Sequence, residues 1–337
     1  MPGEQPQKKV IKINTNECPY PPSPRVVDAL KEADWEKLRL YPDAICRDLT
    51  ESLAAYYGVK KEQVFVGVGS DDVLSMCYLA YFNGPDPVLF PDITYSFYDV
   101  WAEVYRIPFR SIPLTEDFSI DPADYRVKNG GIVIANPNAP TGREQSLDDI
   151  EDIVSHNQNS VVLVDEAYAD FGRVTALPLI EKYDNVAVVR TMSKSRAMAG
   201  MRIGYLISNE KLIKYINDVK YSVNSYTMNL PSLLAGKAAI EDDEYFRGLV
   251  SRVIKTREDT SDRLKAMGWT LLPSSTNFVF AKPPAPHEAV KIFQALRERE
   301  IYVRHFDKPR ISDYLRISMG TEEEMDAFFD ALESIMR

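Results

Sequence analysis

The sequence predicts an α/β protein: a three-layer large domain built around a mostly parallel sheet, and a smaller α+β domain. Five short β-branched runs are almost wholly apolar, and strands buried on both faces belong in a parallel sheet that helices cover on both sides. The segments between the runs are long enough for crossover helices, and this alternation is typical of α/β folds. The runs cover residues 64–66, 88–90, 132–134, 161–164 and 186–189.

Helices are expected in the segments that join these strands. The clearest start signal precedes Leu147, because Ser146 can cap a helix there and two aspartates follow in the first turn. Together the strands and helices predict a large domain over residues 38–241. The expected helices cover residues 71–81, 95–105 and 147–157.

After Glu241 the pattern changes to a long charged helical stretch that ends before Gly268, as a glycine just beyond a helix allows. Short strand-like segments and two further helices follow. Residues 1–37 and 242–337 are therefore expected to form the smaller domain, and a cleft between two domains is a common place for a ligand. The expected elements are helices over 244–267, 287–299 and from 321 onward, and strands in 269–272, 277–280, 301–304 and 314–318.

The charge and composition exclude several classes of protein. With 40 basic and 50 acidic residues the net charge is −10, which disfavours general nucleic-acid binding and anionic membrane surfaces. No apolar run approaches the roughly 18 residues of a membrane helix, and the first residues lack the apolar core of a secretory signal. The cysteines, Cys18, Cys46 and Cys77, are scattered, so neither a disulfide framework nor a zinc site is expected. These features predict a cytoplasmic protein without a metal.

Polar motifs follow three of the predicted strands. Residues 67–71, Gly-Val-Gly-Ser-Asp, turn from a strand into a helix whose free N–H groups suit a small phosphate; the third glycine of a dinucleotide motif is missing. Asp165 ends another strand, with Tyr168 close behind it. Lys194 follows a third strand among small residues, which favours nucleophilic amine chemistry, and Arg202 comes after it. Taken singly, these motifs also fit an ordinary turn, a helix cap and a solvated lysine.

Their combination is more specific, because the carboxyl ends of parallel strands meet at one edge of a sheet. A pyridoxal phosphate site needs a lysine for the covalent link, a carboxylate that keeps the pyridine nitrogen protonated, and a phosphate cradle. The three motifs supply this set. They predict pyridoxal 5′-phosphate as the cofactor.

Three segments carry a resemblance to a known family: Asn136–Gly142 (NPNAPTG), Asp165–Tyr168 (DEAY) and Ser193–Arg202. They resemble fold-type I pyridoxal phosphate aminotransferases, and more narrowly the histidinol-phosphate aminotransferases. The resemblance runs from about Asn14 to Thr321, nearly the whole chain.

The resemblance implies a role for each matching residue. Lys194 would bind the cofactor and carry the proton, Asp165 would pair with the pyridine nitrogen, Tyr168 would contact the ring hydroxyl and Tyr95 would stack on the ring. The family usually has asparagine where Ala139 stands, so either Asn138 replaces that amide or Tyr168 acts alone. The phosphate would be held by Ser70, Asp71, Thr191, Ser193 and Arg202.

The resemblance also implies a homodimer, in which Tyr41 reaches the cofactor phosphate of the neighbouring subunit. Arg316 would grip the substrate anion with Arg304 on the neighbouring strand, and planar guanidinium groups suit carboxylates and phosphates. Asn16 would line the substrate pocket.

The reaction expected from the resemblance is transamination of L-histidinol phosphate with 2-oxoglutarate, in histidine biosynthesis. The aromatic arm of well-known members is missing before Lys12, so other reactions on the same scaffold stay open: an aromatic or broad-range aminotransferase, or a threonine-phosphate decarboxylase. A non-catalytic pyridoxal phosphate sensor is a further alternative. Such regulators carry a DNA-binding module in front, for which there is no room before Asn14.

Overall fold

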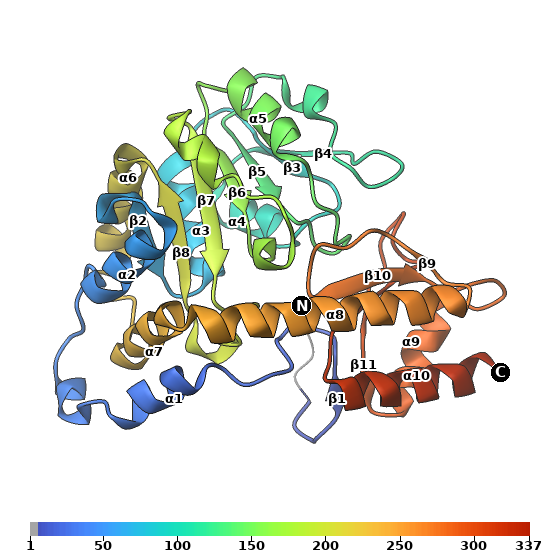
Figure 1. The fold of residues 1–337 in the computed structure, drawn as a ribbon. Coiled ribbons are helices and arrows are strands. Elements are labelled where there is room, and N and C mark those ends of the chain that lie inside the picture. The colour runs from blue at the N-terminus through green and yellow to red at the C-terminus, as the bar shows by residue number, and fades with distance from the viewer. Residues whose placement is uncertain (1–5) are drawn as a thin grey trace.

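A seven-stranded sheet forms the centre of the larger part of the molecule, in the order β2-β8-β7-β6-β5-β3-β4 (Figure 1). The structure is a computed structural model that describes residues 6–337; residues 1–5 of the predicted small domain lie outside it. β8 runs antiparallel to both of its neighbours, and the other pairs of neighbouring strands in this sheet are parallel. The strands are β2 (Val64–Gly67), β3 (Val88–Pro91), β4 (Phe109–Ile112), β5 (Gly131–Ala135), β6 (Val162–Asp165), β7 (Val186–Thr191) and β8 (Gly204–Ser208).

Helices cover both faces of this sheet, because successive strand side chains point to opposite sides. Val162 and Val164 of β6 pack into the core on one face, whereas Leu163 packs into the core on the other. The first core includes side chains of α2 (Arg47–Tyr57), α5 (Leu147–His156) and α7 (Leu230–Glu241). The second includes side chains of α3 (Ser70–Tyr81), α4 (Tyr98–Tyr105) and α6 (Glu210–Val223). The predicted three-layer α/β class is confirmed.

A third core belongs to the smaller part, where a four-stranded antiparallel sheet has the order β12-β13-β10-β9. Two further strands, β1 and β11, pair in parallel. The strands are β1 (Ile11–Lys12), β9 (Thr270–Leu271), β10 (Phe278–Lys282), β11 (Ile301–Tyr302), β12 (Arg304–His305) and β13 (Leu315–Ser318). The helices are α8 (Asp243–Ala266), α9 (Ala289–Glu298) and α10 (Glu322–Met336).

The amino-terminal segment contacts both parts of the molecule. β1 pairs with β11 of the smaller part, and the following helix α1 (Pro24–Lys31) packs against α7. Figure 1 shows α8 running across the molecule from α7 toward β9. The domain limits at residues 38 and 241 stay a prediction.

Two predicted helix ends are confirmed and one predicted strand is corrected. The Ser146 hydroxyl accepts from the Asp149 N–H at the start of α5, and Gly268 after α8 has φ +83°. The segment 301–304 is not one strand: it divides at Val303, and its halves join different sheets. Among residues 6–337 no helix is both long and apolar enough to span a bilayer.

Candidate active site

A cavity of about 390 Å³ opens at the carboxyl ends of β5, β6 and β7, where α/β sheets place their ligands. Its wall contains most of the residues predicted from the three strand-end motifs. Thr15 and Glu17 of the amino-terminal segment also line it, although no motif singled them out. The predicted residues in the wall are Ser70, Asp71, Tyr95, Asp165, Tyr168, Thr191, Ser193, Lys194 and Arg202.

The start of α3 forms an anion cradle. Gly69 is its N-cap with φ +85°, and no side chain caps the helix, so its first N–H groups and positive dipole end are available to bind an anion. Arg202 lies beside this turn: its Nη1 donates to Ser193 Oγ at 3.4 Å, and its Nη2 is 3.8 Å from Asp71 Oδ2. A Cβ on Gly69 would lie 2.4 Å from Arg202 Nη2, so a side chain at this position would displace the end of the Arg202 side chain.

Asp165 supplies a buried carboxylate at the end of β6. The Tyr98 hydroxyl donates to its Oδ2 at 2.8 Å, and the Ala167 N–H donates to its Oδ1 at 3.2 Å. Burial raises the pKa of Asp165 to about 6, although both hydrogen bonds act in the opposite direction. A cationic partner inside the cavity would stabilise the carboxylate and lower its pKa again. Tyr98 was missed by the sequence reasoning, because its position on α4 resembles an ordinary core tyrosine.

Lys194 enters the cavity from the loop after β7. Its Nζ donates to the Thr15 carbonyl at 3.1 Å and lies 5.9 Å from the centre of the Tyr168 ring. Tyr95 donates its hydroxyl hydrogen to Asp71 Oδ1 at 2.9 Å, and burial raises its pKa, so it is a neutral donor.

Asn16 lies behind the wall rather than in it. Its Nδ2 donates to the Tyr168 hydroxyl at 2.8 Å, and its Oδ1 accepts from Ser318 Oγ at 2.8 Å. Asn16 therefore orients Tyr168, and the hydroxyl hydrogen of Tyr168 has no acceptor among the described residues.

Arg304 and Arg316 are directly opposite each other on β12 and β13. The Arg316 guanidinium lies over the Phe278 and Phe306 rings, and its Nη2 donates to the Asn14 carbonyl at 2.9 Å. No carboxylate among residues 6–337 pairs with Arg316, and its Nε is buried without a hydrogen-bond partner. Burial, together with a smaller effect of Arg304, lowers its pKa to about 10, so the guanidinium stays charged at neutral pH.

Asn138 and Tyr41 also lie outside the cavity wall, as do Asn16, Arg304 and Arg316. The amide nitrogen of Asn138 already donates both of its hydrogens, one to the Ile93 carbonyl and one to Thr141 Oγ1, each at 2.9 Å. Its amide therefore has no hydrogen left for the ring hydroxyl, and Ala139 is the neighbour that lines the cavity. Tyr41 is 81% exposed and stacks on Tyr226, with ring centres 4.6 Å apart.

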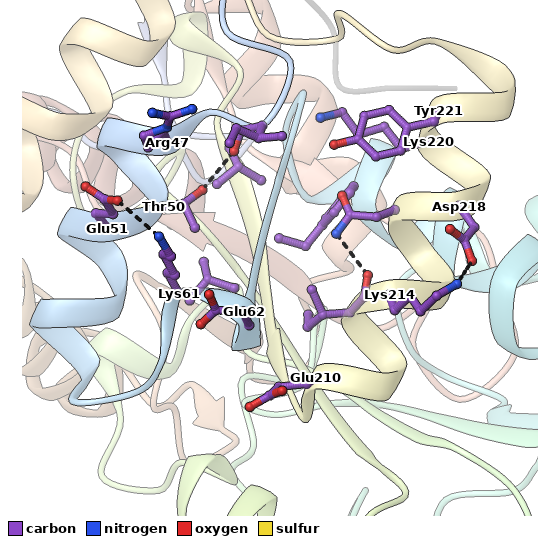
Figure 2. Close-up of a pocket in the computed structure, with 16 residues that line it drawn as sticks. Arg47, Thr50, Glu51, Lys61, Glu62, Glu210, Lys214, Asp218, Lys220 and Tyr221 are labelled. Atoms are coloured by element: carbon purple, nitrogen blue, oxygen red, sulfur yellow. Dashed lines mark hydrogen bonds and ion pairs between the residues drawn. The ribbon is translucent and has the colours of Figure 1, made fainter.

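A larger cavity, of about 500 Å³, lies between α2 and α6 beside β2 (Figure 2). Four of its charged groups form two ion pairs: Lys61 lies 3.6 Å from Glu51, and Lys214 lies 2.6 Å from Asp218. It contains none of the predicted site residues. The described residues also hold no cluster of three or more side chains suited to a metal ion.

The fold and this set of side chains define a class of enzyme. Residues 8–332 match the model of the family described as aminotransferase class I and II, and the chain belongs to that family. It is 49% identical over 335 residues to "Histidinol-phosphate aminotransferase" of Clostridium botulinum (strain Okra / Type B1), covering 99% of this chain and 94% of the relative.

Solved structures of related enzymes have the same fold. The histidinol-phosphate aminotransferase of Sinorhizobium meliloti, in complex with pyridoxal-5′-phosphate, has a TM-score of 0.89 and 25% identity, covering 98% of this chain and 92% of that one. L-threonine-O-3-phosphate decarboxylase of Porphyromonas gingivalis has a TM-score of 0.82, covering 96% and 98% of the two chains. Its 20% identity shows a shared fold and nothing more.

Proposed function

We propose that the protein is a pyridoxal phosphate-dependent aminotransferase that exchanges the amino group between L-histidinol phosphate and 2-oxoglutarate, in histidine biosynthesis. The observation that carries the proposal is the convergence of Lys194, Asp165 and the α3 anion cradle on one cavity, in a chain 49% identical to a protein of that name. The aromatic and decarboxylase alternatives have the shared fold as their support, without a relative of comparable identity among those described above.

The residues of the cavity fit this cofactor. The uncapped α3 terminus, Ser193 and Arg202 form a cradle for a phosphate, and Thr191 supports it, since its Oγ1 accepts from the Ser193 N–H at 3.1 Å. Asp165 would hold the proton of the pyridine nitrogen, which gives its desolvated carboxylate a cationic partner.

When bound, the cofactor supplies an electron sink for the pair of electrons left at the substrate α-carbon. Lys194 Nζ would take the α-proton as general base and then, as general acid, would release it to a second carbon instead of back to the α-carbon. Tyr168 would donate its hydroxyl hydrogen to the ring hydroxyl oxygen of the cofactor, because Asn16 already donates to the Tyr168 oxygen.

Substrate selection depends on Arg316 and Arg304. A buried guanidinium without a carboxylate partner is costly, and a substrate anion would supply that partner. Histidinol phosphate and 2-oxoglutarate both carry two negative charges, so one pair of arginines suits both substrates.

We further propose a cytoplasmic homodimer in which Tyr41 reaches the partner's cofactor phosphate. Several large apolar side chains beside Tyr41 are exposed, and contiguous exposed apolar surface often marks an interface. They are Leu38, Leu40, Ile45, Val223 and Tyr226. The three cysteines are free thiols, in agreement with a reducing compartment.

The test is turnover of L-histidinol phosphate with 2-oxoglutarate by the purified holoenzyme, compared with aromatic amino acids and threonine phosphate. We expect histidinol phosphate to be preferred. Borohydride reduction followed by peptide mapping should fix the cofactor on Lys194, and Lys194→Ala should abolish transamination. Absence of turnover with histidinol phosphate, or full activity of Lys194→Ala, would contradict the proposal.

A further inference from the structure

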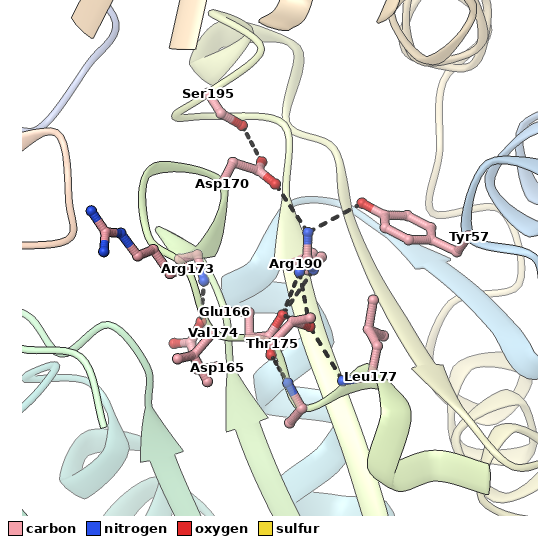
Figure 3. Close-up of polar contacts among 12 residues, drawn as sticks. Tyr57, Asp165, Glu166, Asp170, Arg173, Val174, Thr175, Leu177, Arg190 and Ser195 are labelled. Atoms are coloured by element: carbon pink, nitrogen blue, oxygen red, sulfur yellow. Dashed lines mark hydrogen bonds and ion pairs between the residues drawn. The ribbon is translucent and has the colours of Figure 1, made fainter. Parts of the chain in front are cut away.

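A cluster of four polar side chains lies beside the cavity without lining it (Figure 3). At its centre, Arg190 Nε and Nη2 donate to Glu166 Oε2 at 3.0 and 2.6 Å. Arg190 Nη1 donates to Asp170 Oδ1 at 3.0 Å, and Asp170 Oδ2 accepts from the Ser195 hydroxyl. We call Glu166, Asp170, Arg190 and Ser195 the Arg190 cluster.

Three of the four members of the cluster are buried, and the Asp170 side chain is 22% exposed. Glu166 is 3% exposed, Arg190 7% and Ser195 2%. Glu166 is further satisfied by the Ala176 N–H and the Thr175 hydroxyl, at 2.6 and 2.9 Å. Well-packed apolar residues often stabilise a fold as much as a buried ion pair does, so stability alone does not explain the cluster.

Two of its four members are the chain neighbours of the two central groups of the cavity. Glu166 follows Asp165, and Ser195 follows Lys194. Asp165 and Lys194 line the cavity, whereas the side chain of Glu166 contacts Arg190 and that of Ser195 contacts Asp170. One hydrogen-bonded chain therefore joins the strand end that presents the carboxylate to the loop that presents the amine.

The amine of Lys194 depends on that loop for its position. Its one hydrogen bond in the described structure goes to the Thr15 carbonyl, and no carboxylate pairs with it. The next residues are anchored: Ser195 by Asp170, and Arg196 by a hydrogen bond to the Ala239 carbonyl. The Arg196 guanidinium also lies 3.9 Å from the centre of the Phe246 ring.

We propose that Asp170 and Ser195 are positioning residues for Lys194. Arg190, fixed by Glu166, holds the Asp170 carboxylate, and the hydrogen bond from Ser195 holds the backbone that carries the amine. The inference rests on the proposed role of Lys194 in transamination. A misplacement of a reacting group by about 1 Å can cost on the order of 100-fold in rate.

The test is Ser195→Ala in the holoenzyme. We expect kcat to fall roughly tenfold or more, with KM for the amino substrate unchanged within about twofold, because the chemical step and not binding depends on the amine position. The visible circular dichroism of the bound cofactor should change as well. Ser195→Thr keeps the hydroxyl and should restore both properties.

The matched control is Ser208→Ala. Ser208 is also buried, and its hydroxyl donates to the Val186 carbonyl at the opposite end of β7 from Lys194. We expect this variant to lose comparable stability and to keep kcat and the dichroism of the wild type.

Two results would overturn the proposal: wild-type kcat and dichroism in Ser195→Ala, or equal losses in Ser195→Ala and Ser208→Ala. The dichroism is recorded without substrate. If the wild type fails to use histidinol phosphate, the proposed function fails, while the dichroism and the threonine rescue still decide the positioning role.

Discussion

Asp165 illustrates how burial and hydrogen bonding compete at a single residue. Tyr98 and the Ala167 N–H favour its charged form, but desolvation outweighs them and raises the pKa to about 6. The ordinary value is 3.8, so the folded, cofactor-free chain binds this proton more tightly than the unfolded chain. A cation at the cavity end of the carboxylate would reverse the balance.

This residue makes stability depend on pH. Because the folded-state pKa is raised, the contribution of Asp165 to the free energy of unfolding falls as pH rises from about 4 to about 6, by a total of about 3 kcal/mol. Asp165→Asn removes the dependence. Urea unfolding of the cofactor-free proteins should show similar stability near pH 4 and a more stable variant at pH 7.5. A stability difference that does not change with pH would contradict this assignment.

Arg316 is the second residue whose environment predicts a measurable effect. Arg316→Lys keeps the charge but loses the planar fork that binds an anion through two N–H groups. We expect kcat/KM for histidinol phosphate to fall roughly 100-fold, mostly through KM. Arg263→Lys is the control, since Arg263 is exposed and pairs with Asp326 on the surface. Steady-state kinetics that fail to separate the two variants would argue against substrate binding by Arg316.

At the scale of elements, the cradle depends on how β2 turns into α3. Gly69 has φ +85° and no room for a Cβ beside Arg202. Gly58 has a similar φ of +69°, but nothing lies within 4 Å of a Cβ placed there. A substitution at Gly58 therefore tests backbone strain alone, whereas the same substitution at Gly69 adds a clash with Arg202.

We expect Gly69→Ala to weaken cofactor affinity by tenfold or more, since Arg202 must move away from the phosphate position. Gly58→Ala should cost about 1 kcal/mol of stability, from its positive φ, and leave the affinity unchanged. Cofactor titration and thermal unfolding of both variants measure the difference. Equal affinities would show that Arg202 moves without consequence.

The sequence predicts some strands of the large sheet and misses others. The five runs that are apolar on both faces are strands of the large sheet, because their pattern is local. β4 was not predicted, since Phe109, Arg110 and Ser111 are exposed at the edge of the sheet. β8 is wholly buried, yet nothing in residues 204–208 indicates that it runs antiparallel between β2 and β7.

For the whole molecule, the feature that bears on assembly is the exposed apolar surface around Tyr41. Two neighbouring segments, residues 35–45 and 221–226, expose apolar side chains, and Tyr41 and Tyr226 join them by stacking. A twofold dimer would cover the same surface on both copies.

We expect Leu40→Asp to dissociate the proposed dimer, because it places a charge in the apolar interface. Tyr41→Phe should leave the dimer intact and weaken cofactor affinity roughly tenfold, since it removes one hydroxyl from the partner's phosphate. Sedimentation and cofactor titration check the two effects. A wild-type monomer with full activity would contradict the dimer.

Sequence patterns were sufficient to predict the α/β class and the groups that end the strands, because strand periodicity and strand-end residues are local features. They also singled out Asp165 and Lys194 as candidates. The three-dimensional structure was needed to show that Asp165 and Lys194 line the cavity while their neighbours Glu166 and Ser195 join Arg190 behind it. It also showed that the Asn138 amide hydrogens bind Ile93 and Thr141 outside the cavity wall. The physical reason is that hydrogen-bond partners and facing directions depend on how distant strands align, which no local pattern contains.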